Sequence, residues 1–579
     1  MHKVIKRFPT DSHKLDDFSS VLNRVYANRN IQSSVELDYS ISKLLPFDKL
    51  KGINEAAELI CDAIKNNTKI VIVGDFDVDG ATSTTVAVKA LQSMGATNVE
   101  FLVPNRFEYG YGLTPEIVQV AVERFRPDVI ITVDNGISSI EGVKEAKALD
   151  IKVIVTDHHL PGETLPGADA IVNPNQPGDE FPSKMLAGVG VIFYVMLAVR
   201  SLLREQGWFK AQSMSEPNLA ELLDLVALGT VADVVPLDYN NRILVSQGLA
   251  RIRSGQVSVG IKALIDITGR ERERLIASDF GFAIAPRLNA AGRLDDMSLG
   301  INCLLSNDIS VAHKIAQQLD DINHARRDIE ADMKQQALKL LDEMQLDNIQ
   351  QDENASLPFG LCLFDEGFHE GVVGIIASRI KDRWHRPVIV FAKTDGNCLK
   401  GSGRSVKGLH IRDALDSVAA SHPELITKFG GHAMAAGLTI AEADYEIFSQ
   451  AFDAEVRRHL CDDDLKGIVL SDGELTESEF SLQTAEELRY AGPWGQTFQE
   501  PVFDGVFNII NKRIVGEKHL KMSLQPQGSR IEVDAIAFNT TDEDWSNDQL
   551  QAKVAYRLDV NVFRGRQSLQ LMVEHIEPV

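Results

Sequence analysis

The segment KVIVTDHHLPG, residues 152–162, decides the fold of the first half of this chain. Its β-branched run, residues 153–155, is typical of a buried strand, and the Pro-Gly pair that follows is typical of a turn. Between them stand one acid and two imidazoles: Asp157, His158 and His159. Taken alone, three polar residues after a strand are equally well explained as a surface loop, so their meaning depends on the rest of the chain.

The same pattern recurs along the sequence from residue 69 onward. Short β-branched runs alternate with amphipathic stretches that predict helices, over residues 82–94, 114–124 and 140–149. Continuous apolar strands separated by helices predict a parallel sheet that is covered by helices on both faces. We therefore expect an α/β domain over residues 46–308, preceded by an N-terminal extension of residues 1–45.

Three further regions follow this domain. Apolar residues at three- and four-residue steps predict one long connecting helix over residues 309–346. A second α/β pattern covers residues 355–462. In residues 463–579, apolar and polar residues alternate, and Arg564-Gly565 stands where a hairpin turn is needed. This last pattern predicts a small antiparallel barrel or sandwich.

Composition limits the class of protein. The chain has 579 residues, too many for one hydrophobic core. Five scattered cysteines without a CxxC pair argue against a disulfide scaffold or a thiolate zinc site and favour a reducing cytosol. The N-terminus lacks the apolar stretch of a signal peptide, and the longest uncharged run, residues 185–199, is too short to span a bilayer. We expect a cytoplasmic protein without a membrane segment.

The net charge of −24 lowers the expectation of a nucleic-acid partner only modestly. Whole-chain charge governs solubility and long-range steering, whereas a local basic groove can still neutralise phosphates. Bound cations would also offset a cluster of carboxylates. The acidic composition therefore slightly favours a metal site.

Acids follow three strands of the expected parallel sheet. One strand leads to Asp75, Asp77 and Asp79, the next to Asp134, and the third to the acid–imidazole triplet. The carboxyl ends of parallel strands share one edge, where ligands usually bind. Neighbouring carboxylates repel one another unless a cation lies between them, and oxygen ligands with imidazole suit Mn²⁺ or Mg²⁺. A single Asp after a strand is usually a helix cap, but three such strands together favour a metal site.

Four motifs in this order resemble those of the DHH phosphoesterase family, and in particular its single-strand-specific 5′→3′ exonucleases. The motifs are GDFDVDGATS (74–83), TVDNGI (132–137), TDHH (156–159) and LGTVADVVPL (228–237). The resemblance extends to PRLNAAGRL (286–294), the DHH-associated region (370–391, 401–405 and 429–438), and an OB-type domain around residues 561–576. It implies two α/β lobes, the DHH domain and the DHH-associated domain, joined by the long helix and followed by an OB-type barrel.

By this resemblance, six residues would coordinate two divalent metal ions, Mn²⁺ or Mg²⁺, with Asp134 bridging them: Asp75, Asp77, Asp79, Asp134, His158 and Asp233. His159 would contact the scissile phosphate, and Asp157 would orient the imidazoles. Many family members carry a histidine four residues before Asp77, where this chain has Val73. Either Asp75 supplies the missing ligand, which we favour, or the first metal is held more weakly.

Substrate contacts are expected on both lobes. Arg106, Tyr109 and Tyr111 follow a strand of the first sheet and could hold a phosphate and stack bases, or form an ordinary polar loop. The resemblance adds a nucleotide-binding and phosphate-binding set, for which interdomain ion pairs and tight turns are the alternatives: Arg287, Asn289, Arg293, Ser378, Arg379, Arg404, Ser405, Gly431 and His432.

The resemblance thus implies an exonuclease that removes nucleotides from the 5′ end of single-stranded DNA in repair and recombination. Two cations would activate water and neutralise the phosphoryl oxygens. A DHH phosphodiesterase for short oligonucleotides or cyclic dinucleotides, or a pyrophosphatase, is the alternative, although neither needs the C-terminal domain. A non-catalytic scaffold is a third, which the intact acids oppose. A single-strand-binding protein and a recombination helicase are the partners implied for an expected monomer.

Overall fold

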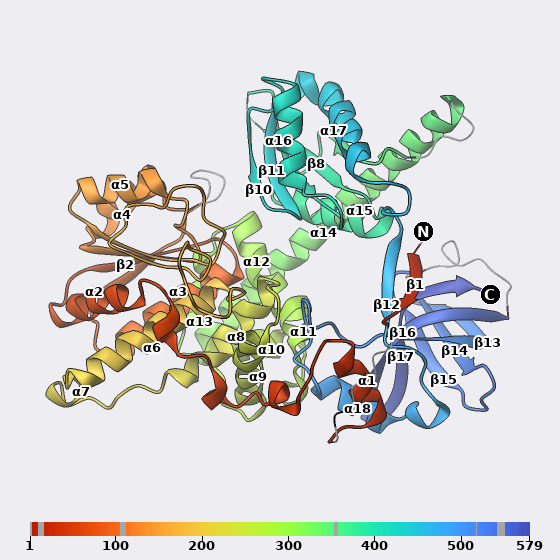
Figure 1. Cartoon of the computed structure of the whole chain (residues 1–579), viewed down its shortest axis with the longest axis horizontal. Coiled ribbons are helices and arrows are strands. Elements are labelled where there is room, and N and C mark those ends of the chain that lie inside the picture. Colours follow the sequence, from red (N-terminus) through yellow and green to blue (C-terminus); the bar gives the residue numbers. More distant parts are fainter. Residues whose placement is uncertain are drawn as a thin grey trace.

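The computed structural model describes residues 3–9, 15, 17–104, 112–351, 357–394, 396–516, 518–540 and 550–579. They form two α/β lobes, a long helix that connects them, and a C-terminal barrel (Figure 1). The fold predicted from the sequence is therefore confirmed.

The first lobe is built on a five-stranded parallel sheet with the order β3-β2-β4-β5-β6. The strands are β2 (Ile70–Gly74), β3 (Val99–Leu102), β4 (Val129–Val133), β5 (Lys152–Thr156) and β6 (Ala170–Val172). All residues of β2 and β4 are buried, as expected for central strands with apolar residues on both faces. The register aligns Gly74 with Val133 and Val133 with Thr156, so these three strands end level with one another.

Helices cover both faces of this sheet. One face packs against α4 (Pro115–Phe125) and α5 (Ile140–Ala148). The other packs against α2 (Ile53–Lys65), α3 (Val78–Ser93) and α6 (Gly188–Glu205). Local signals fix two helix starts: Thr114 caps α4 ahead of Pro115, and the Asp77 carboxylate accepts from the first backbone N–H groups of α3.

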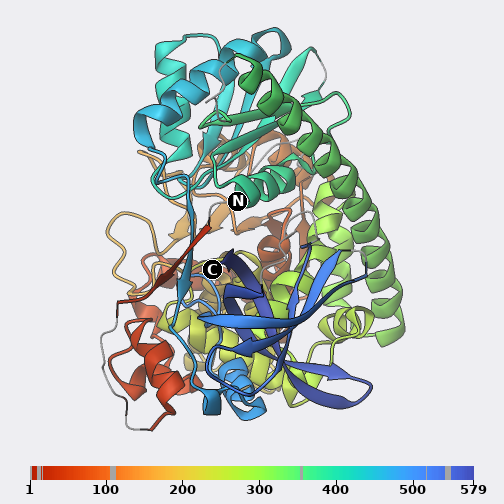
Figure 2. The same cartoon turned by 90° about the vertical axis from the view of Figure 1, so that its right-hand side faces the viewer.

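The rest of the first lobe is helical. It contains α8 (Leu223–Ala232), α9 (Tyr239–Arg253), α10 (Val259–Thr268), α11 (Ala277–Asp279), a π-helical turn (Phe280–Ile284), α12 (Ala285–Leu294) and α13 (Ser298–Leu305). The connecting helix α14 (Ile309–Gln351) has 43 residues, which gives a length of about 65 Å. It packs against α10, α12 and α13 at one end and against the second lobe at the other (Figure 2).

The second lobe carries a mixed sheet with the order β10-β11-β9-β8-β7. Its strands are β7 (Leu361–Phe364), β8 (Val388–Thr394), β9 (Cys398–Arg404), β10 (Lys428–Gly431) and β11 (Ala435–Ala441). The helices α15 (Val373–Trp384), α16 (Ile411–Ser421) and α17 (Tyr445–His459) pack against it.

The C-terminal domain is a closed barrel with the strand order β13-β14-β15-β17-β16. The strands are β13 (Phe503–Val515), β14 (His519–Pro526), β15 (Val533–Ala537), β16 (Gln551–Phe563) and β17 (Arg566–Pro578). Arg564 and Gly565, both at positive φ, form the expected hairpin turn. The expected barrel is confirmed, and its neighbouring strands pair antiparallel except β15 and β17, which pair in parallel. An odd number of strands cannot close a barrel with every neighbouring pair antiparallel.

The N-terminal extension reaches the far end of the chain. Strand β1 (Lys3–Arg7) pairs in parallel with β12 (Gly467–Ser471), which joins the second lobe to the barrel (Figure 2). Arg7 pairs with Asp504 of the barrel at 2.8 Å, and Arg29, just after α1 (Ser20–Ala27), pairs with Asp472 at 2.9 Å. The first residues therefore hold the barrel to the rest of the molecule.

Within the described residues, none of the helices combines the length and the apolar character that a bilayer crossing requires.

Candidate active site

The acids predicted from three strands meet at the carboxyl edge of the first sheet. Their ligand atoms form overlapping groups within 4.8 Å: Asp75, Asp77 and Asp134 in one, and Asp79, His158 and Asp233 in a second. A third group joins Asp134 with His158 and His159. Asp233 comes from a different element, the C-terminal end of α8. Because Asp134 and His158 each belong to two groups, the three groups form one continuous cluster.

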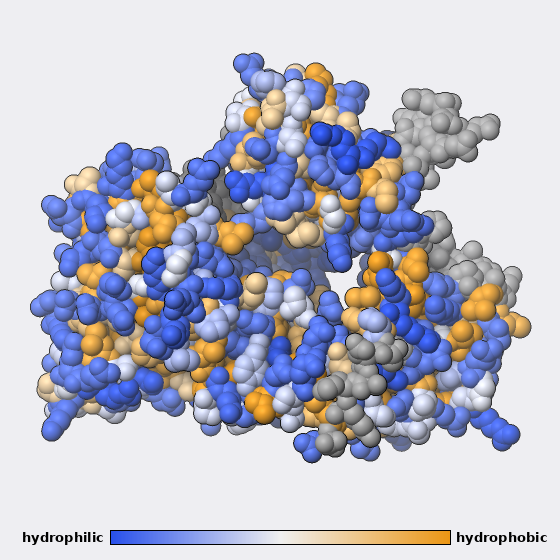
Figure 3. Space-filling view, in the orientation of Figure 1, coloured by the Kyte–Doolittle hydropathy of each residue, from blue (hydrophilic) through white to orange (hydrophobic). Residues whose placement is uncertain are grey.

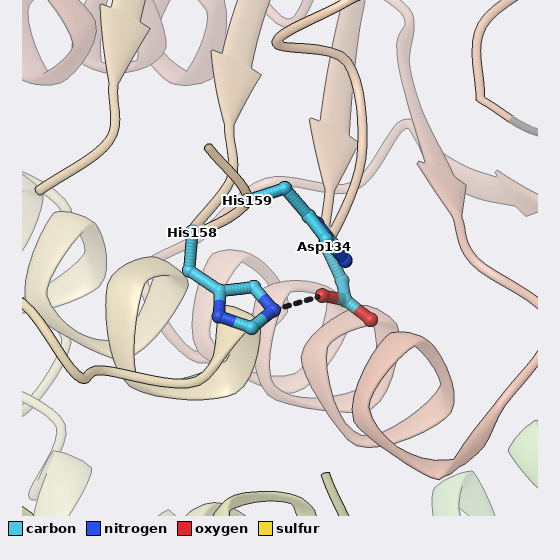
Figure 4. Close-up of side chains that lie close together, drawn as sticks. All are labelled: Asp134, His158 and His159. Atoms are coloured by element: carbon cyan, nitrogen blue, oxygen red, sulfur yellow. Dashed lines mark ion pairs between the residues drawn. The ribbon is translucent and has the colours of Figure 1, made fainter. Parts of the chain in front are cut away.

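His158 points into the centre of this cluster. Its Nε2 atom lies 3.2 Å from Asp134 Oδ1, the contact drawn in Figure 4, and 3.4 Å from Asp233 Oδ2. Within the described part of the chain, His158 Nε2 and Asp233 Oδ2 are buried and make no hydrogen bond. Buried polar atoms without hydrogen bonds are costly unless another group satisfies them.

Burial and crowding shift the pKa values of these groups. Burial, together with the charges of Asp79 and Asp77, raises the pKa of Asp134 well above its ordinary value. Burial and the neighbouring Asp77 raise the pKa of Asp79 to about 7. Burial and the charge of His159 lower the pKa of His158 to about 4, which leaves a neutral imidazole.

The residues present fit divalent metal ions. A cation among the carboxylates would replace repulsion by attraction and would satisfy the buried nitrogen and oxygen atoms that face each other. Carboxylate oxygens with one neutral imidazole, and no cysteine thiolate, suit Mn²⁺ or Mg²⁺.

Asp157 holds the ring of His159 and not that of His158. Its Oδ1 atom lies 2.7 Å from His159 Nδ1 and accepts from the backbone N–H groups of both histidines, while Oδ2 accepts from the N–H of Ile137 at 2.9 Å. Burial alone would lower the pKa of His159, but the hydrogen bond and charge of Asp157 raise it to about 9. His159 is therefore a cation at neutral pH, beside a neutral His158.

A glycine at the start of α6, which was not predicted from the sequence, belongs to the site. The backbone N–H groups of Gly188 and Val189 donate to the Asp79 carboxylate at 2.6 and 2.9 Å. A Cβ atom on Gly188 would lie 2.6 Å from the side chain of Asp134, so only glycine fits. The signal in the sequence is the GVG run that opens an otherwise apolar helix, residues 188–190.

The structure places Asp75 and Val73 in different surroundings. Val73 is fully buried in the apolar layer between the sheet and α4. The Asp75 carboxylate lies with Asp77 and Asp134 in the first ligand group. Asp75, and not Val73, is therefore placed among the residues that could hold a metal ion.

The second lobe faces the acids across an interlobe cleft, where the molecular surface is deeply hollowed (Figure 3). One cavity of about 580 Å³ lies beside Asp77 and is lined by residues of both lobes, including Asn289, Arg293, Gly371, Gly374, Lys400, Arg404 and Lys428. A second cavity of about 980 Å³ lies beside His159 and includes Asp157, His410, Arg412, Gly431 and His432. The rings of His159 and His432 are 6.0 Å apart and stacked.

The structure brings only part of the predicted binding set to this cleft. Asn289, Arg293, Arg404, Gly431 and His432 line it, and the unpredicted Lys400, Lys428, His410 and Arg412 join them. Four predicted residues do not line either cavity and make internal contacts instead: Arg287 with Asp320 (2.8 Å), Ser378 with the carbonyl of Gly374, Arg379 with Glu330 (2.8 Å) and Ser405 with the carbonyl of Leu409. Arg106, Tyr109 and Tyr111 lie outside the described residues.

Family models match three parts of the chain. They are the N-terminal domain of the DHH family (residues 69–230), the DHHA1 domain (358–458) and the RecJ OB domain (471–575). Together they cover the first sheet, the second lobe and the barrel.

Relatives match nearly the whole chain. The single-stranded-DNA-specific exonuclease RecJ of Dickeya dadantii is 53% identical, with 99% of each chain covered, and that of Escherichia coli is 51% identical, with 96% of each covered. The crystal structure of RecJ from Thermus thermophilus with Mn²⁺ has a TM-score of 0.78 at 30% identity and covers 96% of this chain and 76% of that one. The same protein with Mg²⁺ has a TM-score of 0.72 at 28% identity, covering 96% and 74%. The chain belongs to the RecJ family of DHH phosphoesterases, the metal-dependent single-stranded-DNA-specific exonucleases.

Proposed function

We propose that this protein hydrolyses the phosphodiester bonds of single-stranded DNA from the 5′ end and releases nucleotides. One observation carries the proposal: a buried cluster of carboxylates, in which Asp134 belongs to two ligand groups, faces a wall of cationic side chains across the cleft. The first feature suits metal-assisted chemistry, and the second suits a phosphate backbone.

Six residues would hold two divalent cations, with Asp134 shared between them: Asp75, Asp77, Asp79, Asp134, His158 and Asp233. The low pKa of His158 supports this role, because a metal ligand must be the neutral imidazole. Bound cations would supply an activated water and charge stabilisation at the phosphoryl oxygens. Gly188 has no Cβ atom to collide with the Asp134 side chain. The backbone N–H of Gly188 donates to the Asp79 carboxylate and orients it.

His159 would donate to a non-bridging oxygen of the scissile phosphate. It carries a positive charge at neutral pH, and Asp157 fixes its ring through Nδ1, which leaves Nε2 to face the substrate. His432 of the second lobe lies opposite, so a phosphate at the edges of the two rings would contact both lobes. Arg404, Arg293 and Asn289 would hold neighbouring phosphates in the cavity beside Asp77.

The burial of the metal-site acids supports selection of single strands. Asp79 and Asp134 are 1% and 2% exposed, and the neighbouring Asp77 lies in a cavity lined by residues of both lobes. A phosphate in a duplex would therefore have to leave the paired strand to reach these acids. Arg564 and Arg566, exposed on the barrel hairpin, are candidates for further backbone contacts.

Predictions about the cellular setting, the partners and the further substrate contacts remain proposals. They are the action of the protein as a cytoplasmic monomer in DNA repair and recombination, recruitment by a single-strand-binding protein and a helicase, and substrate contacts by Arg106, Tyr109, Tyr111, Arg287, Ser378, Arg379 and Ser405.

The test is a degradation assay on one oligonucleotide labelled at either its 5′ or its 3′ end, with Mn²⁺ or with a chelator. We expect the 5′ label to appear at once as a mononucleotide, only with Mn²⁺, while the 3′-labelled strand shortens gradually. Early release of the 3′ label would show that degradation starts at the 3′ end, against the proposed polarity. Cleavage of a dinucleotide but not of a long strand would favour the oligonucleotide phosphodiesterase.

A further inference from the structure

The turn that follows β6 lies beside the two adjacent histidines of the metal-site cluster. Its sequence is NPNQ, residues 173–176, and we call it the asparagine turn. Strand β6 pairs with β5 so that Val172 aligns with Thr156, and the Asp157 N–H donates to the Val172 carbonyl at 3.1 Å. The register therefore brings the asparagine turn level with the segment that carries the histidines.

Each of the two histidines receives a hydrogen bond from one asparagine of this turn. Asn175 Nδ2 donates to the backbone carbonyl of His158 at 2.6 Å, and Asn173 Nδ2 donates to that of His159 at 2.9 Å. Asn173 is fully buried, and Asn175 is half-buried. Hydrogen bonds are stronger in such surroundings than in water. The two contacts are separate, with one asparagine for each histidine.

These contacts complete the attachment of the two histidine backbones. Asp157 Oδ1 accepts from the backbone N–H groups of both histidines. His158 and His159 are thus each held at the N–H by Asp157 and at the carbonyl by an asparagine. The ring leaves the backbone between these two groups, so its position depends on both of them.

The asparagine turn is itself anchored. The N–H of Asn175 donates to Asn173 Oδ1 at 2.7 Å, and the Lys184 ammonium donates to the carbonyl of Pro174 at 2.8 Å. The second hydrogen of Asn175 Nδ2 is directed to the Lys184 carbonyl at 3.3 Å. The turn is therefore a fixed support against which the histidine carbonyls are placed.

A turn alone would not require both amide groups. Asparagine is common in turns because its side-chain oxygen accepts a backbone N–H two residues further on, as Asn173 does here. An aspartate oxygen can accept in the same way. The Nδ2 atoms of Asn173 and Asn175 donate to histidine carbonyls, which a carboxylate cannot do. The contacts to the histidines therefore select asparagine over aspartate at both positions.

We propose that the two asparagines are positioning residues that act on different steps of the reaction. Asn175 acts through His158 on the binding of metal. Asn173 acts through His159 on the binding of the phosphate. This inference rests on the proposed function, in which His158 holds a cation and His159 contacts the scissile phosphate. One short turn would thereby set the distance between the cations and the bond that is cleaved.

The test removes each donor in the full-length protein with a neutral side chain of similar shape, in the variants Asn175→Leu and Asn173→Leu. The variants Asn175→Asp and Asn173→Asp also remove the donor but keep an oxygen acceptor. Asn175→Ala and Asn173→Ala replace the leucine variants if these do not fold. The matched control is Gln176→Ala, because Gln176 is buried in the same turn but donates to the carbonyls of Ile171 and Lys51, at 2.9 and 3.1 Å.

Three quantities are measured for every variant. They are the affinity for Mn²⁺ by calorimetry, the affinity of the Mn²⁺-loaded protein for thymidine 5′-monophosphate, and the rate of degradation of an oligothymidylate over a range of Mn²⁺ concentrations. Thermal unfolding without metal shows whether each variant is folded.

We expect Asn175→Leu to lower the affinity for Mn²⁺ by roughly 10- to 100-fold, the range for loss of a group that supports a metal ligand. Excess Mn²⁺ should then restore most of the rate. Asn173→Leu should leave the Mn²⁺ affinity nearly unchanged and weaken binding of the mononucleotide by about tenfold, as for loss of one charged hydrogen bond. Excess Mn²⁺ should not restore its rate. Gln176→Ala should lower only the unfolding temperature.

Three results would overturn the inference. If the asparagine variants behaved like Gln176→Ala, the turn would have a structural role only. If both asparagine variants lost Mn²⁺ and mononucleotide affinity equally, the turn would act on the site as one unit. An effect of the aspartate variants alone would be one of charge.

Failure of the proposed function would look different. A wild-type protein that binds Mn²⁺ and the mononucleotide but degrades no single-stranded DNA would contradict the proposed function. The two affinities would still decide whether the asparagines act separately on the metal and on the phosphate.

Discussion

The two walls of the interlobe cleft are built in opposite ways. On the first lobe, Asp79 and Asp134 are 1% and 2% exposed, and backbone atoms and a close glycine fix their positions. On the second lobe, Arg404 is half-buried and His432 is exposed, and both line the cleft with positive or titratable groups. The difference supports the proposal that bond cleavage takes place at a rigid, buried wall and strand binding at a more adaptable, partly solvated one.

The largest expected effect comes from removing the central acid. Asp134→Ala should lower the rate of strand degradation with Mn²⁺ by more than about a hundredfold, the upper range for loss of an outer partner of a metal site. The affinity for the strand in the presence of a chelator should change little, because the second lobe remains intact. Asp128→Ala is the matched control, since this exposed acid lies at the opposite end of β4. An active Asp134→Ala variant would contradict the two-metal assignment.

A single methyl group should have the next largest effect. Gly188→Ala places a Cβ atom against Asp134 and should cost roughly 10- to 100-fold in rate and in Mn²⁺ affinity. Gly190→Ala on the same helix meets only the side chain of Leu186 and should be nearly neutral. Calorimetric titration with Mn²⁺ and initial rates check both variants. If Gly188→Ala and Gly190→Ala behaved alike, the Asp134 side chain would be able to move away from the added methyl group. That result would contradict the rigidity of the first-lobe wall.

The buried wall should also respond to pH. The pKa of Asp79, about 7 in the metal-free protein, lies above its ordinary value of 3.8, so the carboxyl group holds a proton below neutral pH. A cation must displace this proton, and Mn²⁺ affinity should fall by up to about tenfold per unit as the pH drops from about 8 to about 6. Conversely, the metal-free protein should lose stability as the pH rises through 7, and Mn²⁺ should restore it.

Titration calorimetry in buffers of different ionisation enthalpy counts the protons released, and thermal unfolding with and without Mn²⁺ checks the sign of the stability change. Affinity independent of pH over this range would show that the acids are already ionised before the metal binds.

The smallest effect should come from the second lobe. Arg404→Ala removes one charged contact to phosphate and should raise KM for a long strand by about tenfold while kcat stays nearly constant. Lys407→Ala, which removes an exposed cation three residues further along, serves as control. Steady-state kinetics separates the two constants. A fall in kcat alone would show that Arg404 takes part in bond cleavage. It would contradict the division of roles between the two walls of the cleft.

The sequence predicts the acids on the first-lobe wall of the cleft better than the contact residues on the second-lobe wall. The strand ends at Gly74, Val133 and Thr156 are local signals, and parallel pairing then brings the acids that follow them together whatever the details of the loops. The contacts of the second lobe depend on how α14 orients it, which no local pattern encodes. For this reason His410 and Arg412 were missed, and Arg379 points to Glu330 rather than into the cleft.

Contacts between distant segments were also beyond prediction. Gly188 matters only because α6 begins against Asp134, more than fifty residues away in the sequence. Phe282 reads as an ordinary helical residue until a π-helical turn exposes it. By contrast, the hairpin at Arg564-Gly565 follows from two residues and their neighbours, and it was predicted correctly.

The pairing of β1 with β12 has a consequence for the order in which the molecule is completed during synthesis. Lys3 leaves the ribosome more than 450 residues before its partner Gly467. At ~5–20 residues per second, the interval is on the order of a minute. Until then the N-terminal strand has no partner for its backbone, and both α/β lobes can fold before it is secured. Attachment of the barrel is therefore expected to be the last step of assembly.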